Sequence, residues 1–337
     1  MSVAPASSRP ASTRSGRALR VPDFFVVGHP KSGTTALYEM LAAHPQIGMA
    51  TEKEPWFFSA AELRHRAPPR EPVGIPATLE EYLALFDGAT PDQRLGEAST
   101  TYLWSPTAAA AIAAVCPGAR IVALLREPAS FLRSLHLQFV EAHIEVEHDF
   151  ERALALEPER RAGRQIPRHT YWPQLLLYSE HVRYTQQLRR YCEAFAPEQI
   201  LVLVYEDFKR DNEATLRRLL RFLEVDDGVG IGRVSANPTV RPRSRALHGA
   251  VHAIAVGRGP FSRAAKDSIK LLTPERARRT ALDWFRRRVL YREVAAADAG
   301  EAATMAELRR RFRGEVEAVS EHLDRDLIGL WGYDGIA

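Results

Sequence analysis

The feature that most constrains the fold is a repeated alternation of short apolar runs with helical patterns. Continuous apolar runs lie at 24–28, 121–125 and 200–204, and residues 95–98 are expected to add a shorter strand. Runs of this length without polar alternation are typical of strands buried on both faces of a sheet. A helical pattern follows each of the three longer runs, and Asp207 is the expected N-cap of the last one. Strands that alternate with helices predict an α/β domain with a parallel sheet flanked by helices.

The two ends of the chain differ from this central pattern. Residues 1–22 are rich in Ala, Ser, Pro and Arg, so we expect a disordered tail, and residues 23–337 are expected to form a single domain. From residue 245 onward the pattern is mainly helical. No apolar run reaches the roughly 18 residues that span a bilayer, and the tail lacks the apolar segment of a signal peptide. We therefore expect a cytoplasmic protein.

Cysteine and histidine content limits the chemistry. The chain has two cysteines, too few for a disulfide framework, and no Cys/His spacing typical of a zinc site. We therefore expect no metal.

The segment after the first apolar run has the composition of a phosphate-binding loop. Residues 28–35 read Gly-His-Pro-Lys-Ser-Gly-Thr-Thr and lead into a helical pattern. Glycine lets the backbone approach an anion, the helix start offers free N–H groups, and Lys31 adds a mobile charge. In a Walker A loop the lysine follows the second glycine, whereas Lys31 precedes Gly33. The loop predicts a phosphate-bearing ligand. An atypical P-loop nucleotide enzyme and an ordinary strand-to-helix turn are the alternatives.

Lysine is rare in this chain, which draws attention to where it occurs. Only five of the 46 basic residues are lysines. One is Lys31 in the loop and another is Lys53. A compact ammonium can approach a bridging oxygen where a rigid guanidinium fits poorly.

The loop resembles a known family. Residues 30–35, Pro-Lys-Ser-Gly-Thr-Thr, are similar to the 5′-phosphosulfate loop of sulfotransferases that use 3′-phosphoadenosine 5′-phosphosulfate (PAPS). Arg126, at the end of the second long run, and Ser134, eight residues later, resemble the pair that grips the 3′-phosphate in that family. The resemblance implies a bacterial member with a P-loop-like fold and PAPS as co-substrate. It also implies a set of phosphosulfate-binding residues, namely Lys31, Ser32, Gly33, Thr34 and Thr35.

The general base has its own candidate segment. Residues 51–58 resemble the Glu-x-x-Phe-Phe stretch of heparan-type sulfotransferases, and Glu54 stands at the position of the family's base. The resemblance implies that Glu54 takes the acceptor's proton while Lys31 stabilises the departing phosphate. His136 is the reserve base, because many family members use a histidine. A solvated Glu-Lys-Glu turn is the alternative reading of this segment.

One position departs from the heparan-type pattern. Those members often carry a lysine in the segment that matches residues 96–99, and this chain has Ala98 there. Lys53 or a histidine replaces it, or the site works with Lys31 alone.

The segment 241–290 is strongly basic, with 13 Lys and Arg against 3 Asp and Glu. Such asymmetry points to an anionic partner. The resemblance implies that Arg241 and Arg243 close over the 3′-phosphate. Peripheral membrane contact is an alternative that we do not favour, and no recognised module accompanies the charge, so we expect no nucleic-acid binding.

The sequence thus predicts sulfuryl transfer from PAPS to a hydroxyl of a small-molecule, sugar or lipid acceptor. A P-loop kinase that uses ATP and a non-catalytic nucleotide-binding protein are the alternatives. Oligomeric state and acceptor identity are left open.

Overall fold

The computed structural model describes residues 20–60, 75–167, 170, 172–230, 240–242, 291–293 and 299–336. The chain divides into two compact units, each described by itself. The sheet unit comprises Met1–Glu127, Ser179–Ala236 and Arg313–Gly335. The helical unit comprises Pro128–Tyr178, Asn237–Phe312 and Ile336–Ala337. Most of the predicted N-terminal tail lies outside the described residues, and the single-domain boundary at residue 23 stays a prediction.

A five-stranded parallel sheet forms the centre of the sheet unit. Its strands lie in the order β2-β3-β1-β4-β5, so the first strand of the chain is in the middle. The bounds are β1 (Phe24–Gly28), β2 (Ile47–Met49), β3 (Arg94–Ala98), β4 (Arg120–Leu125) and β5 (Ile200–Val204). All five residues of β1 are buried, as the unbroken apolar run predicts. The α/β prediction is confirmed, while the short strand β2 was not expected.

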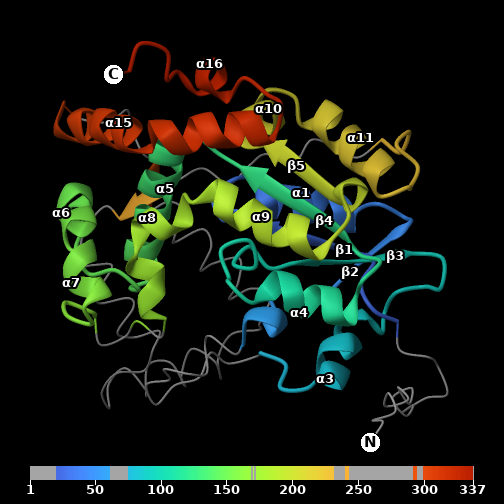
Figure 1. Cartoon of the computed structure of the whole chain (residues 1–337). Coiled ribbons are helices and arrows are strands. Elements are labelled where there is room, and N and C mark those ends of the chain that lie inside the picture. Colours follow the sequence, from blue (N-terminus) through green and yellow to red (C-terminus); the bar gives the residue numbers. More distant parts are fainter. Residues whose placement is uncertain are drawn as a thin grey trace, which may run out of the picture. The chain divides into compact units, whose positions relative to one another are not determined.

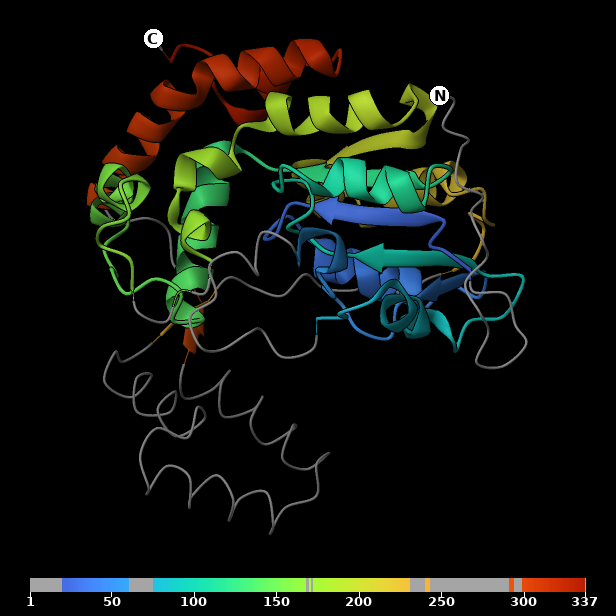
Figure 2. The same cartoon turned by 60° about the horizontal axis from the view of Figure 1, so that its bottom comes forward.

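Helices cover both faces of this sheet (Figures 1 and 2). On one face, α1 (Thr34–Ala42) and α11 (Asn212–Phe222) pack onto side chains of β1, β4 and β5. On the other face, α4 (Ala108–Val115) and α9 (Tyr184–Ala194) pack against each other. The shared core on the α1 side includes Phe24, Val26, Leu37 and Leu219. This two-sided burial explains why the strands lack polar alternation.

Shorter elements complete the sheet unit. They are η1 (Phe57–Ser59), α3 (Leu79–Leu83), η2 (Ala84–Phe86), η4 (Pro197–Gln199), α10 (Tyr205–Arg210) and α16 (Leu327–Trp331). The short helix α8 (Tyr178–His181) and the long helix α15 (Ala299–His322) have residues in both units.

One predicted helix start is wrong. The sequence favoured Asp207 as the N-cap of a single helix after β5, but two helices follow, and Asp207 lies within α10. The helical backbone is interrupted at Asp211, which is extended. Its side chain accepts a hydrogen bond from Ala214 N at 2.9 Å and caps α11. Asp207 instead forms ion pairs with Arg210 and Arg325.

The helical unit is built around α5 (Pro128–Glu141), α6 (Phe150–Ala155), α7 (Glu157–Arg161) and η3 (Pro173–Leu176). A two-stranded antiparallel pair, β6 (Val240–Pro242) and β7 (Tyr291–Glu293), lies against α5. The sequence predicted a helical C-terminal part, and α15 and α16 confirm it, but this strand pair was not expected. The rest of the basic segment 241–290 lies outside the described residues.

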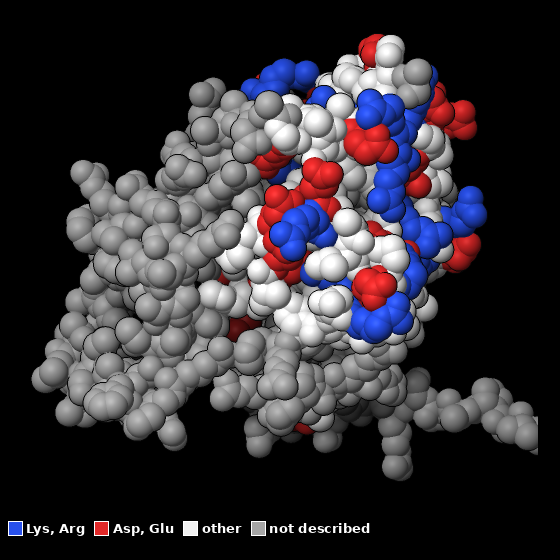
Figure 3. Space-filling model, turned by 90° about the vertical axis from the view of Figure 1, so that its left-hand side faces the viewer, with Lys and Arg blue, Asp and Glu red and all other residues white. Residues whose placement is uncertain are grey.

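Charged side chains on the described surface alternate in sign. Figure 3 shows basic and acidic groups interspersed on one face. Several are neighbours on one helix, such as Arg310 with Glu307 and Arg313 with Glu317, all on α15. Such exposed pairs add little stability. Among the described helices, none combines the length and apolar character needed to cross a bilayer.

Candidate active site

The predicted phosphate loop connects the central strand β1 to helix α1. His29 N donates to Leu124 O at 2.8 Å, which ties the start of the loop to β4. Helix α1 begins at Thr34, and no side chain in the described part of the chain caps it. Its first N–H groups are therefore free to meet an anion. Ser32 and Thr34 are buried beside this helix start, and Thr35 is exposed.

Two residues of the loop have a left-handed backbone. Gly33 has φ 87°, and a Cβ at this position would lie 2.9 Å from ring atoms of Phe208. Only glycine fits such a position without strain. Lys31 has φ 59°, which is uncommon for a residue with a side chain. Left-handed residues of this kind cluster at ligand-binding sites.

Arg126 lies beside the loop. Its Nη1 donates to Lys31 O at 2.7 Å, and its guanidinium lies 4.6 Å from the centre of the Tyr205 ring. Tyr184 donates its hydroxyl hydrogen to Arg126 O at 2.8 Å, which fixes the backbone there. The Arg126 guanidinium is therefore bonded to the backbone of the loop that carries Lys31.

Glu54 lies at the carboxyl end of the neighbouring strand β3. Its N–H donates to Ala98 O at 3.0 Å, and its backbone is left-handed with φ 61°. Oε1 accepts hydrogen bonds from Lys53 Nζ at 2.7 Å and from Thr100 Oγ1 at 3.2 Å. The carboxylate side chain is 29% exposed, so substrate can reach it. Lys53 thus supplies a cation beside the proposed base.

Thr100 links the base to the phosphate loop. Its carbonyl oxygen would lie 2.9 Å from a Cβ on Gly28, the last residue of β1, and its hydroxyl holds Glu54. Strands β1 and β3 pair directly, with Val26 opposite Ala98. Ligands of open α/β sheets bind at this carboxyl edge. The structure therefore brings Glu54 and the Lys31 loop together at one edge.

The two histidines nearest to the predicted site residues in the sequence are buried. His29 Nε2 lies 2.7 Å from Gln187 Oε1, and burial lowers the pKa of His29 to about 3, so the ring is neutral. His136 lies in the helical unit, where its Nδ1 is 3.0 Å from the Tyr178 hydroxyl and its Nε2 is 3.3 Å from His148 O. Burial also lowers the pKa of His136. These contacts are typical of a structural histidine and favour Glu54 as the base.

The remaining predicted nucleotide-binding residues belong to the helical unit. Ser134 is buried on α5, and Arg241 lies in β6, the strand that packs against α5. The elements that carry these two residues are therefore neighbours. Arg243 lies outside the described residues.

Sequence reasoning missed Glu97. This carboxylate on β3 is fully buried, and burial raises its pKa to about 7, with the nearby charge of Glu54 acting in the same direction. A glutamate inside a run that reads as a buried strand was the available signal, because an isolated charge is rarely placed in such a position.

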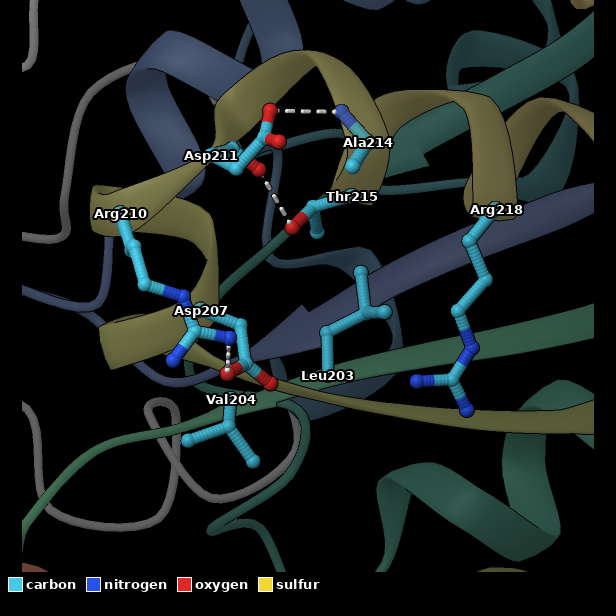
Figure 4. Close-up of a pocket in the computed structure, with 8 residues that line it drawn as sticks. All are labelled: Leu203, Val204, Asp207, Arg210, Asp211, Ala214, Thr215 and Arg218. Atoms are coloured by element: carbon cyan, nitrogen blue, oxygen red, sulfur yellow. Dashed lines mark hydrogen bonds and ion pairs between the residues drawn. The ribbon is translucent and has the colours of Figure 1, made fainter. Parts of the chain in front are cut away.

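A separate hollow of about 250 Å³ lies beside α10 and α11 (Figure 4). Its polar groups pair with each other: Arg210 with Asp207, and Asp211 with Ala214 N and the Thr215 hydroxyl. Arg218 also lines the hollow, and a single arginine beside paired groups does not mark a second site. Within the described ranges, no three Asp, Glu, His or Cys side chains are placed to hold a metal.

Comparison with known proteins decides the family. A model of the sulfotransferase family matches residues 22–228, which is more than half of the chain. The chain belongs to the sulfotransferase family. Its match includes the phosphate loop, Glu54, Glu97, Arg126 and Ser134.

Individual sulfotransferases agree with this assignment. Mouse carbohydrate sulfotransferase 15 is 26% identical over 280 residues, which cover 67% of this chain and 49% of that protein. Human bifunctional heparan sulfate N-deacetylase/N-sulfotransferase 3 is 25% identical over 212 residues, or 61% of this chain and 22% of that protein. The chain therefore spans about half the length of the first of these relatives.

A sulfotransferase from Alicyclobacillus acidocaldarius shares the fold. Its crystal structure aligns with a TM-score of 0.64 at 24% identity, covering 93% of this chain and 99% of that one. Sulfotransferases of this family use PAPS as co-substrate. The uncapped start of α1, the left-handed turn at Gly33 and the cations Lys31 and Arg126 fit the phosphosulfate of such a ligand.

Proposed function

We propose that this chain transfers the sulfuryl group of PAPS to a hydroxyl of an acceptor. Lys31 and the loop residues Ser32, Gly33, Thr34 and Thr35 hold the 5′-phosphosulfate. Arg126 and Ser134, with Arg241 and Arg243, hold the 3′-phosphate. Glu54 accepts the acceptor's proton. PAPS, when bound, supplies a sulfuryl group on a good phosphate leaving group.

The observation that carries the proposal is the Thr100 link. A transferase needs its base and its donor-binding loop within reach of one reacting centre. The Thr100 carbonyl oxygen packs so near Gly28 that a Cβ there would lie 2.9 Å from it, and the Thr100 hydroxyl donates to Glu54 Oε1. One residue thus holds the base beside the loop that would bind the donor.

The hydrogen bonds of Glu54 suit a general base. Lys53 and Thr100 both bind Oε1, and within the described residues Oε2 makes no hydrogen bond. Oε2 is therefore available to the acceptor hydroxyl. As the new oxygen–sulfur bond forms and the bond from sulfur to the phosphate oxygen breaks, the hydroxyl proton moves to Glu54. Lys31 stabilises the negative charge that develops on the departing phosphate.

We infer that the acceptor is a carbohydrate. Two relatives that match more than half of the chain are named for carbohydrate and heparan sulfate substrates. A half-exposed loop with Trp56 and Phe57 follows Glu54. Flat aromatic side chains of this kind offer apolar surface to an amphipathic ligand.

The kinase alternative predicts a different donor. The family match supports sulfuryl rather than phosphoryl transfer. Cytoplasmic location, the lack of a metal, the lack of nucleic-acid binding and the lack of stable membrane contact all stay predictions of the sequence.

The test is a transfer assay with PAPS labelled in its sulfuryl group and a panel of acceptors. The panel contains desulfated glycosaminoglycans, a simple phenol and a glycolipid. We expect label to enter a carbohydrate without added magnesium, and no transfer from ATP. Transfer only to the phenol would contradict the carbohydrate assignment, and turnover of ATP with magnesium but not of PAPS would contradict the proposal as a whole.

A further inference from the structure

Glu97 is a buried carboxylate that has no role in the proposed reaction. It lies on β3 opposite Phe25 of β1 and has no exposed surface. Within the described residues no Lys, Arg or His forms an ion pair with it. A buried unpaired carboxylate costs several kcal/mol unless hydrogen bonds compensate. Its neighbours should therefore explain its presence.

Hydroxyl groups surround Glu97. Tyr82 donates to Oε2 at 3.0 Å. Within the described residues, Oε1 of Glu97 accepts no hydrogen bond. The hydroxyls of Ser99 and Tyr102 are the neighbouring donors that favour its ionised form. Tyr82 thus binds Glu97 directly, and the Ser99 and Tyr102 hydroxyls are close enough to favour its charged form.

Two of these hydroxyls hold the loop that carries the proposed base. Ser99 Oγ accepts a hydrogen bond from Trp56 N at 3.2 Å. The Tyr102 hydroxyl accepts one from Phe58 N at 3.2 Å. A hydroxyl that accepts from an amide must direct its own hydrogen elsewhere, and a carboxylate is the strongest acceptor nearby.

We propose that Glu97 is a positioning residue for Glu54. Its carboxylate orients the Ser99 and Tyr102 hydroxyls, which hold the amides of Trp56 and Phe58. These contacts fix residues 54–58 in a conformation with two left-handed residues, Glu54 at φ 61° and Trp56 at φ 55°. The proposal rests on the function proposed above, because it assigns the loop a catalytic purpose.

The electrostatics of the site agree with this role. Glu97 interacts electrostatically with Glu54, Tyr82, Tyr102 and Cys116. Burial is the main cause of the raised pKa of Glu97, and the three hydroxyl groups counteract it. The hydroxyl shell therefore keeps the ionised form accessible near neutral pH.

Amide hydrogen exchange of the full chain, followed by mass spectrometry at pH 8, tests the contact without an acceptor. In Glu97→Gln we expect peptides covering 51–60 to exchange at least about 10-fold faster, because the two hydroxyls lose their anionic acceptor. Peptides covering 28–35 should not change. Tyr102→Phe, which removes the acceptor for Phe58 N, should reproduce the local pattern. The matched control is Glu157→Gln, on α7 of the helical unit, which should leave 51–60 unchanged.

Two results would overturn the proposal. One is unchanged exchange at 51–60 in Glu97→Gln. The other is equal acceleration throughout the sheet unit, which would make Glu97 a general structural residue. Hydrogen exchange does not depend on turnover. Absence of sulfuryl transfer by the wild-type chain would therefore count against the proposed function, whereas the exchange data alone decide whether Glu97 holds the loop.

Kinetics then separate positioning from stability. We expect Glu97→Gln to lower kcat about 10-fold with unchanged KM for PAPS. In a Glu54→Gln background the same change should have no further effect, because Glu97 acts through Glu54. A full 10-fold loss in that background would contradict the role.

Discussion

Three residues around the proposed site share an uncommon left-handed backbone, and each is held by a hydrogen bond. Arg126 donates to the carbonyl oxygen of Lys31. Glu54 N donates to Ala98 O, and Trp56 N donates to Ser99 Oγ. A left-handed residue with a side chain costs about 1–2 kcal/mol. The surrounding contacts therefore offset a strain that sets the direction of the Lys31 and Glu54 side chains.

Replacing the proposed base tests the residue-level assignment most simply. We expect Glu54→Gln to lower kcat by roughly 100-fold or more, because general-base catalysis contributes about 10²–10⁴. Affinity for adenosine 3′,5′-bisphosphate should not change. The measurement is steady-state transfer together with calorimetry.

Glu52→Gln is the matched control for that substitution. Glu52 lies two residues earlier in the same loop and is exposed. It should keep wild-type turnover. Equal losses in the two variants would mean that the loop contributes charge rather than a specific base.

The raised pKa of Glu97 predicts a pH dependence of stability. Its pKa is about 7 in the folded chain against 4.5 for an ordinary glutamate, so between these values the folded state holds a proton that the unfolded state releases. The contribution of Glu97 to the free energy of unfolding therefore falls as pH rises from 4.5 to about 7, by about 3 kcal/mol in total. Glu54, Tyr82, Tyr102 and Cys116 are the ionisable groups that interact with it.

Urea unfolding of the wild type and of Glu97→Gln at pH 5 and pH 8 measures this effect. The free energy of unfolding of Glu97→Gln, relative to that of the wild type, should be higher at pH 8 than at pH 5. A difference that does not vary with pH would contradict the raised pKa.

At the scale of single elements, the turn from β1 into α1 depends on Gly33. We expect Gly33→Ala to destabilise the chain by about 1–3 kcal/mol, because alanine strains the left-handed backbone and meets the Phe208 ring. Binding of adenosine 3′,5′-bisphosphate should weaken as well. Thermal unfolding and calorimetry measure the two effects.

Gly314→Ala is the opposite control. Gly314 lies inside α15, and a Cβ at this position would meet no other atom of the described chain within 4 Å. Alanine there should stabilise the chain by about 0.5–1 kcal/mol. A stabilising effect of Gly33→Ala would show that the turn does not require glycine.

The sequence predicted those elements whose signal is local. Buried strands such as β1 and β4 appear as unbroken apolar runs, and the loop at 30–35 has a distinctive composition. Arg126 was expected to face the ligand crevice, because it stands at the carboxyl end of a strand in an open sheet. These features depend on neighbours in sequence or on general topology.

Other features required the fold. Asp207 and Asp211 are equally good caps by residue type, and only the break in the backbone at Asp211 decides between them. The charge of Glu97 is unusual for a buried strand, but its role could not be predicted, because its hydroxyl partners Tyr82 and Tyr102 lie outside β3. The contact of Thr100 with both Gly28 and Glu54 likewise depends on the pairing of β1 with β3.

At the scale of the whole molecule, the two units are stabilised differently. The sheet unit has a large apolar core, whereas the helical unit contains a fully buried ion pair between Arg160 and Glu145, with an Nη1–Oε2 distance of 2.7 Å. The same carboxylate accepts from the Tyr178 hydroxyl, which also contacts His136. His136 is thus part of a polar network inside the helical unit.

Removing one partner of this ion pair should lower the free energy of unfolding of the helical unit. We expect Glu145→Ala to cost about 3–5 kcal/mol, because Arg160 would keep a buried charge without a partner. Glu213→Ala breaks the exposed Glu213–Arg217 pair and should cost less than about 1 kcal/mol. Urea unfolding of both variants compares them, and similar losses would contradict the importance of the buried network.

Binding of the PAPS nucleotide by the Lys31 loop is the step on which every other role in the site depends. Calorimetric titration of the chain with adenosine 3′,5′-bisphosphate tests it most directly. We predict one binding site that needs no magnesium, weakened at least about 10-fold by Lys31→Met and unaffected by Lys209→Met, since Lys209 is an exposed lysine on α10. Absence of binding, or equal weakening by both substitutions, would contradict nucleotide binding by this loop.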